Sequence, residues 1–198
     1  MKITTPKGTA QFPWLNKADT KFSELGDYKV NLVVPKDEAA AFVKKVTDAR
    51  KEAAQAEKAK KLAPLPFENE LDDQGNETGN VVIKCKVANK RSKRTGEVWD
   101  RKPALFDSKL TPISATVGGG SQLRLSCELY FWKSANLGMG VMIQPLAVQV
   151  IKLVELGGVS ADDFGFEEED GFEGSAATTE TDDGEAEVLS PESEDELF

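Results

Sequence analysis

The chain has 198 residues and a formal net charge of −9, with two cysteines and no histidine. The lack of histidine excludes Ser-His-Asp catalysis and imidazole metal sites, and Cys85 and Cys127 belong to no paired zinc-binding spacing. No apolar run is long enough for a transmembrane helix, and residues 1–6 lack the apolar core of a secretory signal. We therefore expect a soluble intracellular protein that holds neither a metal nor a cofactor.

The charge is divided unevenly along the chain. Of the 34 acidic residues, 16 lie in residues 162–198, which contain no Lys or Arg. Residues 1–161 hold the other 18 acidic residues and all 25 basic residues. This part of the chain therefore carries a formal charge of +7. A basic body can bind a polyanion. Because the acidic stretch is poor in apolar residues, we expect a folded domain over residues 1–160 and a disordered acidic tail over residues 161–198.

The amino-terminal part predicts two strands. Residues 6–15 predict an extended strand in which Phe12 and Trp14 share one face. These aromatics either pack against the domain or offer faces on which bases can stack. Residues 28–34 alternate apolar and polar side chains, as in a half-buried strand, and Pro35 ends this strand.

A long helix is expected next, over residues 37–61, with Asp37 as its N-cap. It should pack on one side of the domain through a narrow apolar stripe that consists of Phe42, Val46, Ala49, Ala53 and Ala56. Both cysteines fall at apolar positions of strand-like runs, so we expect buried free thiols.

The remainder of the domain reads as β structure. Residues 81–88 predict a strand with one apolar and one partly basic face, a basic loop follows, and residues 97–106 predict a return strand with Glu97, Trp99 and Arg101 on one side. Residues 122–132 give the longest alternation, and residues 141–156 predict one or two strands with a break at Pro145. Several strands with a single helix favour a mainly β fold of the Greek-key barrel type.

The side chains opposite the predicted apolar faces combine cations with aromatics. This mixture suits single-stranded nucleic acid, because cations follow the phosphates and aromatic faces stack on bases without reading sequence. The alternative is a solvated basic hairpin with aromatics that only pack. The candidate DNA-binding residues are Lys84, Lys86, Lys90, Arg91, Lys93, Arg94, Trp99, Arg101, Lys102, Arg124, Tyr130, Trp132, Phe12 and Trp14.

Four segments in this order resemble a known family: Ile-Lys-Cys at 83–85, Phe-Asp-Ser-Lys at 106–109, Gly-Gly-Gly-Ser-Gln-Leu-Arg-Leu at 118–125 and Leu-Val-Glu-Leu at 153–156. They are similar to the single-stranded DNA-binding proteins of tailed bacteriophages, an OB-fold family with an acidic carboxyl-terminal tail. The resemblance implies a non-catalytic protein that coats single-stranded DNA in replication, recombination and repair, in the cytoplasm of the infected bacterial host. It also implies dimerisation, and contacts with the phage DNA polymerase and primase-helicase through the tail residues Glu194, Asp195, Glu196, Leu197 and Phe198.

Physical reasoning assigns the acidic tail a second role. A tethered polyanion has a high local concentration and can compete with DNA for a basic groove, which we expect around Lys84, Arg101, Arg124 and Trp132. The alternative is a tail that only improves solubility. Two other classes of protein are weighed against a DNA-binding protein: an acidic chaperone that binds basic partners, and a metal nuclease that uses acids such as Asp100 and Asp107.

Overall fold

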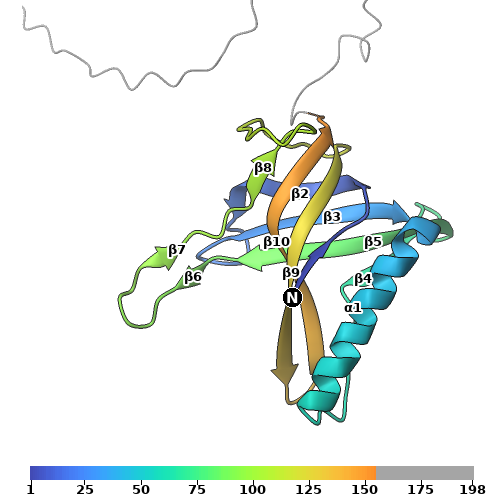
Figure 1. Ribbon diagram of the computed structural model, residues 1–198, viewed down its shortest axis with the longest axis vertical. Coiled ribbons are helices and arrows are strands. Elements are labelled where there is room, and N and C mark those ends of the chain that lie inside the picture. Colours follow the sequence, from blue (N-terminus) through green and yellow to red (C-terminus); the bar gives the residue numbers. More distant parts are fainter. Residues whose placement is uncertain (155–198) are drawn as a thin grey trace, which may run out of the picture. The chain divides into compact units, whose positions relative to one another are not determined.

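A computed structural model describes residues 1–154, and its centre is a closed barrel of five strands (Figure 1). Pairing runs from β9 through β2, β3, β5 and β10 and returns to β9, so the ring has no open edge. The β5–β10 pairing is parallel, whereas the other four pairings are antiparallel. The expected mainly β, OB-fold-like barrel with one long helix is confirmed. The barrel strands are β2 (Gly8–Asp19), β3 (Asp27–Pro35), β5 (Glu77–Ala88), β9 (Gln122–Ser134) and β10 (Gly138–Lys152).

Three shorter strands extend this ring, and two more form a sheet of their own. β1 (Lys2–Thr4) pairs with β9, β4 (Phe67–Leu71) pairs with β5, and β8 (Ala104–Phe106) pairs with β10. β6 (Lys90–Arg91) and β7 (Val98–Trp99) form a separate two-stranded arm, which projects from the barrel at the left of Figure 1.

The barrel interior is filled by alternate apolar residues of its strands. Val30, Leu32 and Val34 of β3 are at most 1% exposed, and β9 contributes a buried row from Leu123 to Leu129. The prediction of buried free thiols is confirmed for Cys85 and Cys127. A hydrogen bond with Cys127 and burial raise the pKa of the Cys85 thiol, so it stays protonated and serves as a core residue.

The helix α1 (Lys36–Ala56) differs from its prediction at both ends. Pro35 precedes its first turn and no side chain caps it, so the expected capping by Asp37 is wrong. The helix ends five residues before Lys61 because the chain turns away at Lys58, whose φ is 50°. The following segment then pairs with the start of β10, where Met139 N–H donates to the Lys61 carbonyl over 3.0 Å.

The buried face of α1 is only partly the expected stripe. Phe42 and Val46 are buried as predicted, and Ala39 and Ala54 join them. Arg50 also lies on this face, where its guanidinium donates a hydrogen bond to the carbonyl of Ala63. Burial lowers the pKa of Arg50. Within residues 1–154 no helix is long and apolar enough to cross a membrane.

Two strand predictions need correction. The return strand over residues 97–106 is interrupted, since residues 100–103 separate β7 from β8. Burial and a hydrogen bond with Asp100, within this interruption, raise the pKa of Tyr28 to about 12. Pro145 does not break the last strand. β10 runs through it with a register shift between Pro145 and Ala147, because a bulge accommodates the missing N–H.

Candidate nucleic-acid interface

A row of outward-facing side chains crosses the first three barrel strands. Trp14 of β2 lies opposite Lys29 of β3, and Lys29 lies opposite Lys86 of β5. These side chains point outward because the neighbouring Leu15 and Cys85 are buried in the core. Trp14 remains 41% exposed. The row therefore places an open aromatic face beside two ammonium groups.

Both ammonium groups in this row are held by aspartates. Lys29 Nζ lies 2.5 Å from Asp19 Oδ2, and Lys86 Nζ lies 2.6 Å from Asp27 Oδ2. Each aspartate side chain is only 8% exposed, and the two aspartates are cross-strand partners. The hydrogen bond from Lys29 holds the pKa of Asp19 below its usual value. These carboxylates fix the lysines in place and cancel much of their charge.

The row continues from β5 onto Gln144 of β10, which lies on the outer side of the barrel but is only 6% exposed. Ile143 of β10 pairs with Cys85 of β5. Because these strands are parallel, the next residues, Gln144 and Lys86, also lie side by side. The Arg101 guanidinium lies against Gln144, and its Nη2 donates to Gln144 Oε1 over 2.8 Å. The Nη1 of Arg101 is buried without an acceptor among the described residues. Trp14, Lys29, Lys86, Gln144 and Arg101 together form what we call the exterior strip.

A second group joins the arm to β9. Lys90 and Trp99 are cross-strand partners in the arm, and the Lys90 ammonium lies 5.5 Å from the ring centroid of Tyr130 on β9. Trp99 is 58% exposed and Tyr130 is 47% exposed. A cation beside exposed aromatic side chains is an arrangement that suits a stacked base with its phosphate. We call these three residues the arm cluster.

The base of the arm is fixed to the barrel. Asn89 N–H donates to the carbonyl of Gly26 over 3.1 Å, and the Asn89 side-chain oxygen accepts from Arg101 N–H over 2.8 Å. Arg91 lies 4.0 Å from Glu24, at the threshold of an ion pair. Lys93 and Arg94 lie in the exposed turn between β6 and β7. The predicted basic loop is thus an anchored hairpin.

Phe12 does not share a simple face with Trp14. The register of β2 with β3 shifts between Gln11 and Trp14, and Phe12 has a φ of 50°. Positive φ is strained for a bulky residue, and such strain is concentrated at functional sites. The bulge leaves Phe12 75% exposed. Phe12 therefore remains a candidate DNA contact, because the bulge rather than strand alternation exposes its ring.

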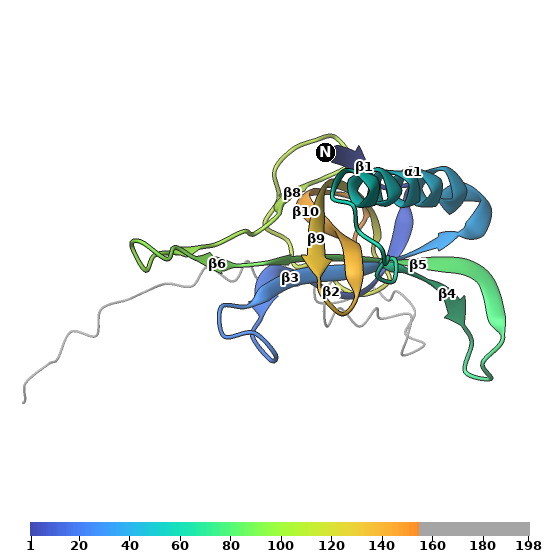
Figure 2. The same cartoon turned by 90° about the horizontal axis from the view of Figure 1, so that it is seen from below.

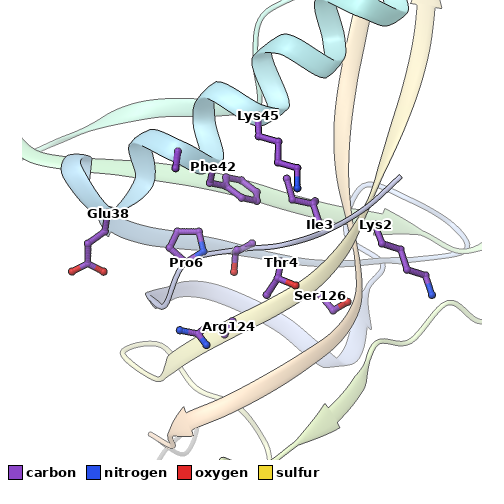
Figure 3. Close-up of a pocket in the computed structure, with 11 residues that line it drawn as sticks. Lys2, Ile3, Thr4, Pro6, Glu38, Phe42, Lys45, Arg124 and Ser126 are labelled. Carbon is purple, nitrogen blue, oxygen red and sulfur yellow. The ribbon is translucent and has the colours of Figure 1, made fainter.

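The expected groove around Lys84, Arg101, Arg124 and Trp132 is wrong as a single site. Lys84 lies two positions before Lys86 on β5 and pairs with Glu68 over 2.5 Å. Arg124 lies eight residues from Trp132 along β9, which is about 27 Å at the rise of a strand. It lines a separate hollow between α1 and β1 (Figure 3).

Trp132 packs rather than standing free. A Cβ atom placed on Gly140 would lie 2.1 Å from the Trp132 indole, so the ring lies directly against the backbone of β10. Trp132 also lines a hollow with Ala53 and Ala56 at the end of α1. The alternative in which the aromatics only pack therefore describes Trp132 better than it describes Tyr130, which is 47% exposed. Lys102 lines yet another hollow beside β8.

Two further candidate contacts, Lys29 and Phe22, were not predicted from the sequence. Lys29 alternates with buried apolar residues of β3, and this periodicity could have identified it as an outward-facing cation. Phe22 is 83% exposed in the loop between β2 and β3, with the Lys21 ammonium 5.4 Å from its ring centroid. A short loop without periodicity gives no signal for such a residue.

The two carboxylates considered as magnesium ligands have other partners. Asp107 Oδ1 accepts hydrogen bonds from the backbone N–H groups of Lys109 and Thr111, each over 2.8 Å, and Asp100 bonds with Tyr28. In residues 1–154 no group of three or more Cys, Asp or Glu side chains is placed to hold a metal ion.

The closed barrel with its strip of cations and open aromatics defines a protein of the OB-fold class that suits single-stranded nucleic acid. A family model described as the single-stranded DNA-binding protein of bacteriophage T7 matches residues 7–153, and the chain belongs to this family. The resemblance inferred from the sequence is thereby confirmed. No curated protein matches the chain.

Solved structures of phage proteins share this fold. The chain is similar to gp2.5, a single-stranded DNA-binding protein encoded by bacteriophage T7, with 25% identity over 88% of this chain and 99% of that chain and a TM-score of 0.65. It is also similar to the single-stranded DNA-binding protein of bacteriophage Enc34 in complex with single-stranded DNA, with 18% identity over 79% of this chain and 89% of that chain and a TM-score of 0.55. A carboxyl-terminally truncated form of the Enc34 protein gives 17% identity over 78% and 87%, with a TM-score of 0.55.

Proposed function

We propose that this protein binds single-stranded DNA without sequence preference during phage DNA replication, recombination and repair, and that it has no catalytic role. The observation that carries this proposal is the exterior strip with the adjoining arm cluster, where Trp14, Trp99 and Tyr130 stay open beside cations. The solved Enc34 complex supports the same ligand class for a protein of this fold.

The contacts divide into two kinds. Bases stack on the open aromatic rings, at about 1–3 kcal/mol per base, and every base has a face that can do so. Phosphates follow the cations that no carboxylate of residues 1–154 neutralises, above all Lys90 and the turn residues Lys93 and Arg94. Because Lys84 and Lys86 are ion-paired, we assign them a weaker share than their position alone suggests.

We extend the proposal to the acidic tail, residues 161–198, which lies outside the described residues. Its 16 acids in residues 162–198 and the basic charge of residues 1–161 support a tail that competes with DNA for the strip. The same tail, through Glu194–Phe198, recruits the phage polymerase and primase-helicase and contributes to a homodimer in the host cytoplasm. Deletion of residues 162–198 should tighten binding to oligo-dT at low salt. Unchanged or weaker binding would exclude competition.

Tryptophan fluorescence tests DNA binding directly. Titration with poly-dT at low salt should quench the emission, and added NaCl should restore it. Trp14→Phe and Trp99→Phe should each remove part of the quenching, whereas Trp132→Phe serves as the matched control because that indole is packed against Gly140. Emission that poly-dT leaves unchanged at every ionic strength would refute stacking on these residues.

A further inference from the structure

A second cationic surface lies where the end of α1 meets the β9–β10 hairpin, at the bottom of Figure 1. Figure 2 shows the same region from below, where the segment after α1 passes beside the hairpin and the arm extends to the left. A hollow of about 580 Å³ opens between this segment and the hairpin. None of the described residues that line it is acidic. We call it the lysine cup and define it by Lys58, Lys60, Lys61 and Lys133.

Backbone contacts fix the frame of the lysine cup. Met139 N–H donates to the carbonyl of Lys61 over 3.0 Å, and Ala63 N–H donates to the carbonyl of Met139 over 2.9 Å. A Cβ atom placed on Gly138 would lie 2.2 Å from the carbonyl oxygen of Lys61, so the hairpin turn lies directly against this segment. The two sides of the cup are therefore held together by their backbones, and the lysine side chains are not needed for this purpose.

Three of the four lysines carry a charge that the described domain does not neutralise. Lys133 has a structural role, because its ammonium donates to the carbonyl of Glu57 over 3.0 Å and lies 3.6 Å from the Glu57 carboxylate. Within residues 1–154, no carboxylate lies within 4.0 Å of Lys58, Lys60 or Lys61, and all three lysines are exposed. The cup therefore suits an anionic ligand.

Lys58 occupies a position at which many helices have glycine. Its φ of 50° is in the left-handed region, and the neighbouring Ala59 N–H donates to the carbonyl of Ala54 over 2.8 Å, which closes the end of α1. A residue with a Cβ atom is strained in this conformation, whereas glycine is not. The helix end alone does not require a lysine here, and strain of this kind is concentrated at functional sites.

The composition of the cup favours phosphate groups over bases. None of its described lining residues is aromatic, so the cup offers no ring on which a base can stack. The cup also shares a strand with the arm cluster, since Ser134 of the cup lining follows Tyr130 by four residues, about 13 Å along β9. A DNA strand that stacks on Tyr130 can therefore reach the cup along the hairpin.

We propose that the lysine cup binds backbone phosphates of single-stranded DNA, as an anchor beyond the stacking residues of the arm cluster. This inference rests on the proposed function and divides its interface into two parts. The first part stacks bases and contacts phosphates, and the second part contacts phosphates alone. Only a strand that is long enough to span both parts occupies the cup.

Oligonucleotides of two lengths test this anchor in the full-length protein. Oligo-dT of about 4 nucleotides, at the lower end of OB-fold site sizes, occupies the stacking part alone, whereas oligo-dT of about 30 nucleotides spans both parts. Replacing Lys58, Lys60 and Lys61 by glutamine should make the salt slope of the long oligonucleotide shallower by about 2, at about 0.7 per lost phosphate contact. Between 50 and 200 mM NaCl, the affinity of the native protein should then fall about 18-fold more than that of the variant. The short oligonucleotide should give the same slope with both proteins.

The matched control replaces Lys44, Lys45 and Lys51 by glutamine. It removes three charges from the same helix outside the cup, so it should leave the slope of the long oligonucleotide unchanged. Lysine acetylation of the native protein, mapped by mass spectrometry, gives a second test that does not depend on the folding of a variant. The long oligonucleotide should protect Lys58, Lys60 and Lys61 from acetylation, and the short one should not.

Two results with the long oligonucleotide would overturn the proposal: a slope of the cup variant equal to the native slope, or acetylation of the three lysines that this oligonucleotide does not reduce. Stronger protection by polyglutamate would also overturn it and would assign the cup to an acidic protein segment. Stronger protection by a duplex of the same length would assign the cup to double-stranded DNA. Each of these results leaves the binding of the short oligonucleotide intact. Failure of the native protein to bind either oligonucleotide would refute the proposed function itself, so the two failures are distinguishable.

Discussion

The aspartates beneath the exterior strip should limit how many phosphates the protein contacts. Asp19 and Asp27 hold the Lys29 and Lys86 ammonium groups at 2.5 Å and 2.6 Å, so a phosphate must displace or share a carboxylate at each lysine. Replacing both aspartates by asparagine keeps the side-chain shape and removes the two competing charges. The lysines then become free to neutralise phosphate.

The magnitude follows from counterion release. Each phosphate contact with a single strand adds about 0.7 to the slope of log Kobs against log salt, so two freed lysines should steepen it by about 1.4. Between 200 and 50 mM NaCl, a four-fold change in salt, the affinity of the double variant should rise about seven-fold more than that of the native protein.

Fluorescence titration with oligo-dT over this salt range measures the slope. Asp48→Asn is the matched control, because Asp48 pairs with Lys44 on the exposed side of α1 and its loss should leave the slope unchanged. Thermal unfolding checks that the double variant remains folded. A slope equal to that of the native protein would refute the reasoning, since it would mean that the ion pairs do not restrain these lysines.

Three further predictions rest on individual side chains. Trp14→Ala should weaken oligo-dT binding by about 1–3 kcal/mol, measured in the same titration, and an unchanged affinity would remove Trp14 from the interface. Gly140→Ala should destabilise the fold by about 1–3 kcal/mol in urea unfolding, because its methyl group would overlap the Trp132 ring; a stability equal to the native value would contradict this packing. The raised pKa of Tyr28, about 12 against 10.0, stabilises the folded state below pH 10, and this stability is lost as the pH rises through 12. Tyr28→Phe should remove that loss from the pH profile of the free energy of unfolding. An identical profile for the variant would exclude Tyr28 as its origin.

Hydrophobic alternation predicted most of the barrel. Apart from Asp27 and Val82, the buried residues of β3, β5 and β9 fall where a period of two places them, and the apolar positions Phe42 and Val46 set the face of α1. The ends of α1 were not predictable in this way, because they depend on tertiary pairing. Residues 57–61 have good helix-forming composition, yet the hydrogen bonds of Lys61 and Ala63 with Met139 compete successfully with another helical turn.

The candidate site was predictable in residue type but not in grouping. Alternation placed Arg124, Tyr130 and Trp132 on the outer face of β9. This strand has 13 residues, however, and the three side chains lie in three different environments along it. The ion pairs could not be predicted from the sequence either. Asp19 and Asp27 lie on either side of a loop, and they contact Lys29 and Lys86 only through strand pairing in the sheet. Surface charge counted from sequence therefore overstated the free cations on the strip.

The closure of the barrel by β10 has a consequence for how the chain acquires its structure. β10 is the last described strand, and it joins β5 to β9, while β1 at the start of the chain pairs with residues 126–128. Until residues 138–152 are available, β9 and the end of β5 beyond its pairing with β4 lack their β10 partner, so the barrel stays open. Contacts between such distant residues are slow to form. The exterior strip is complete only when β10 has joined the barrel, because Gln144 of β10 holds Arg101.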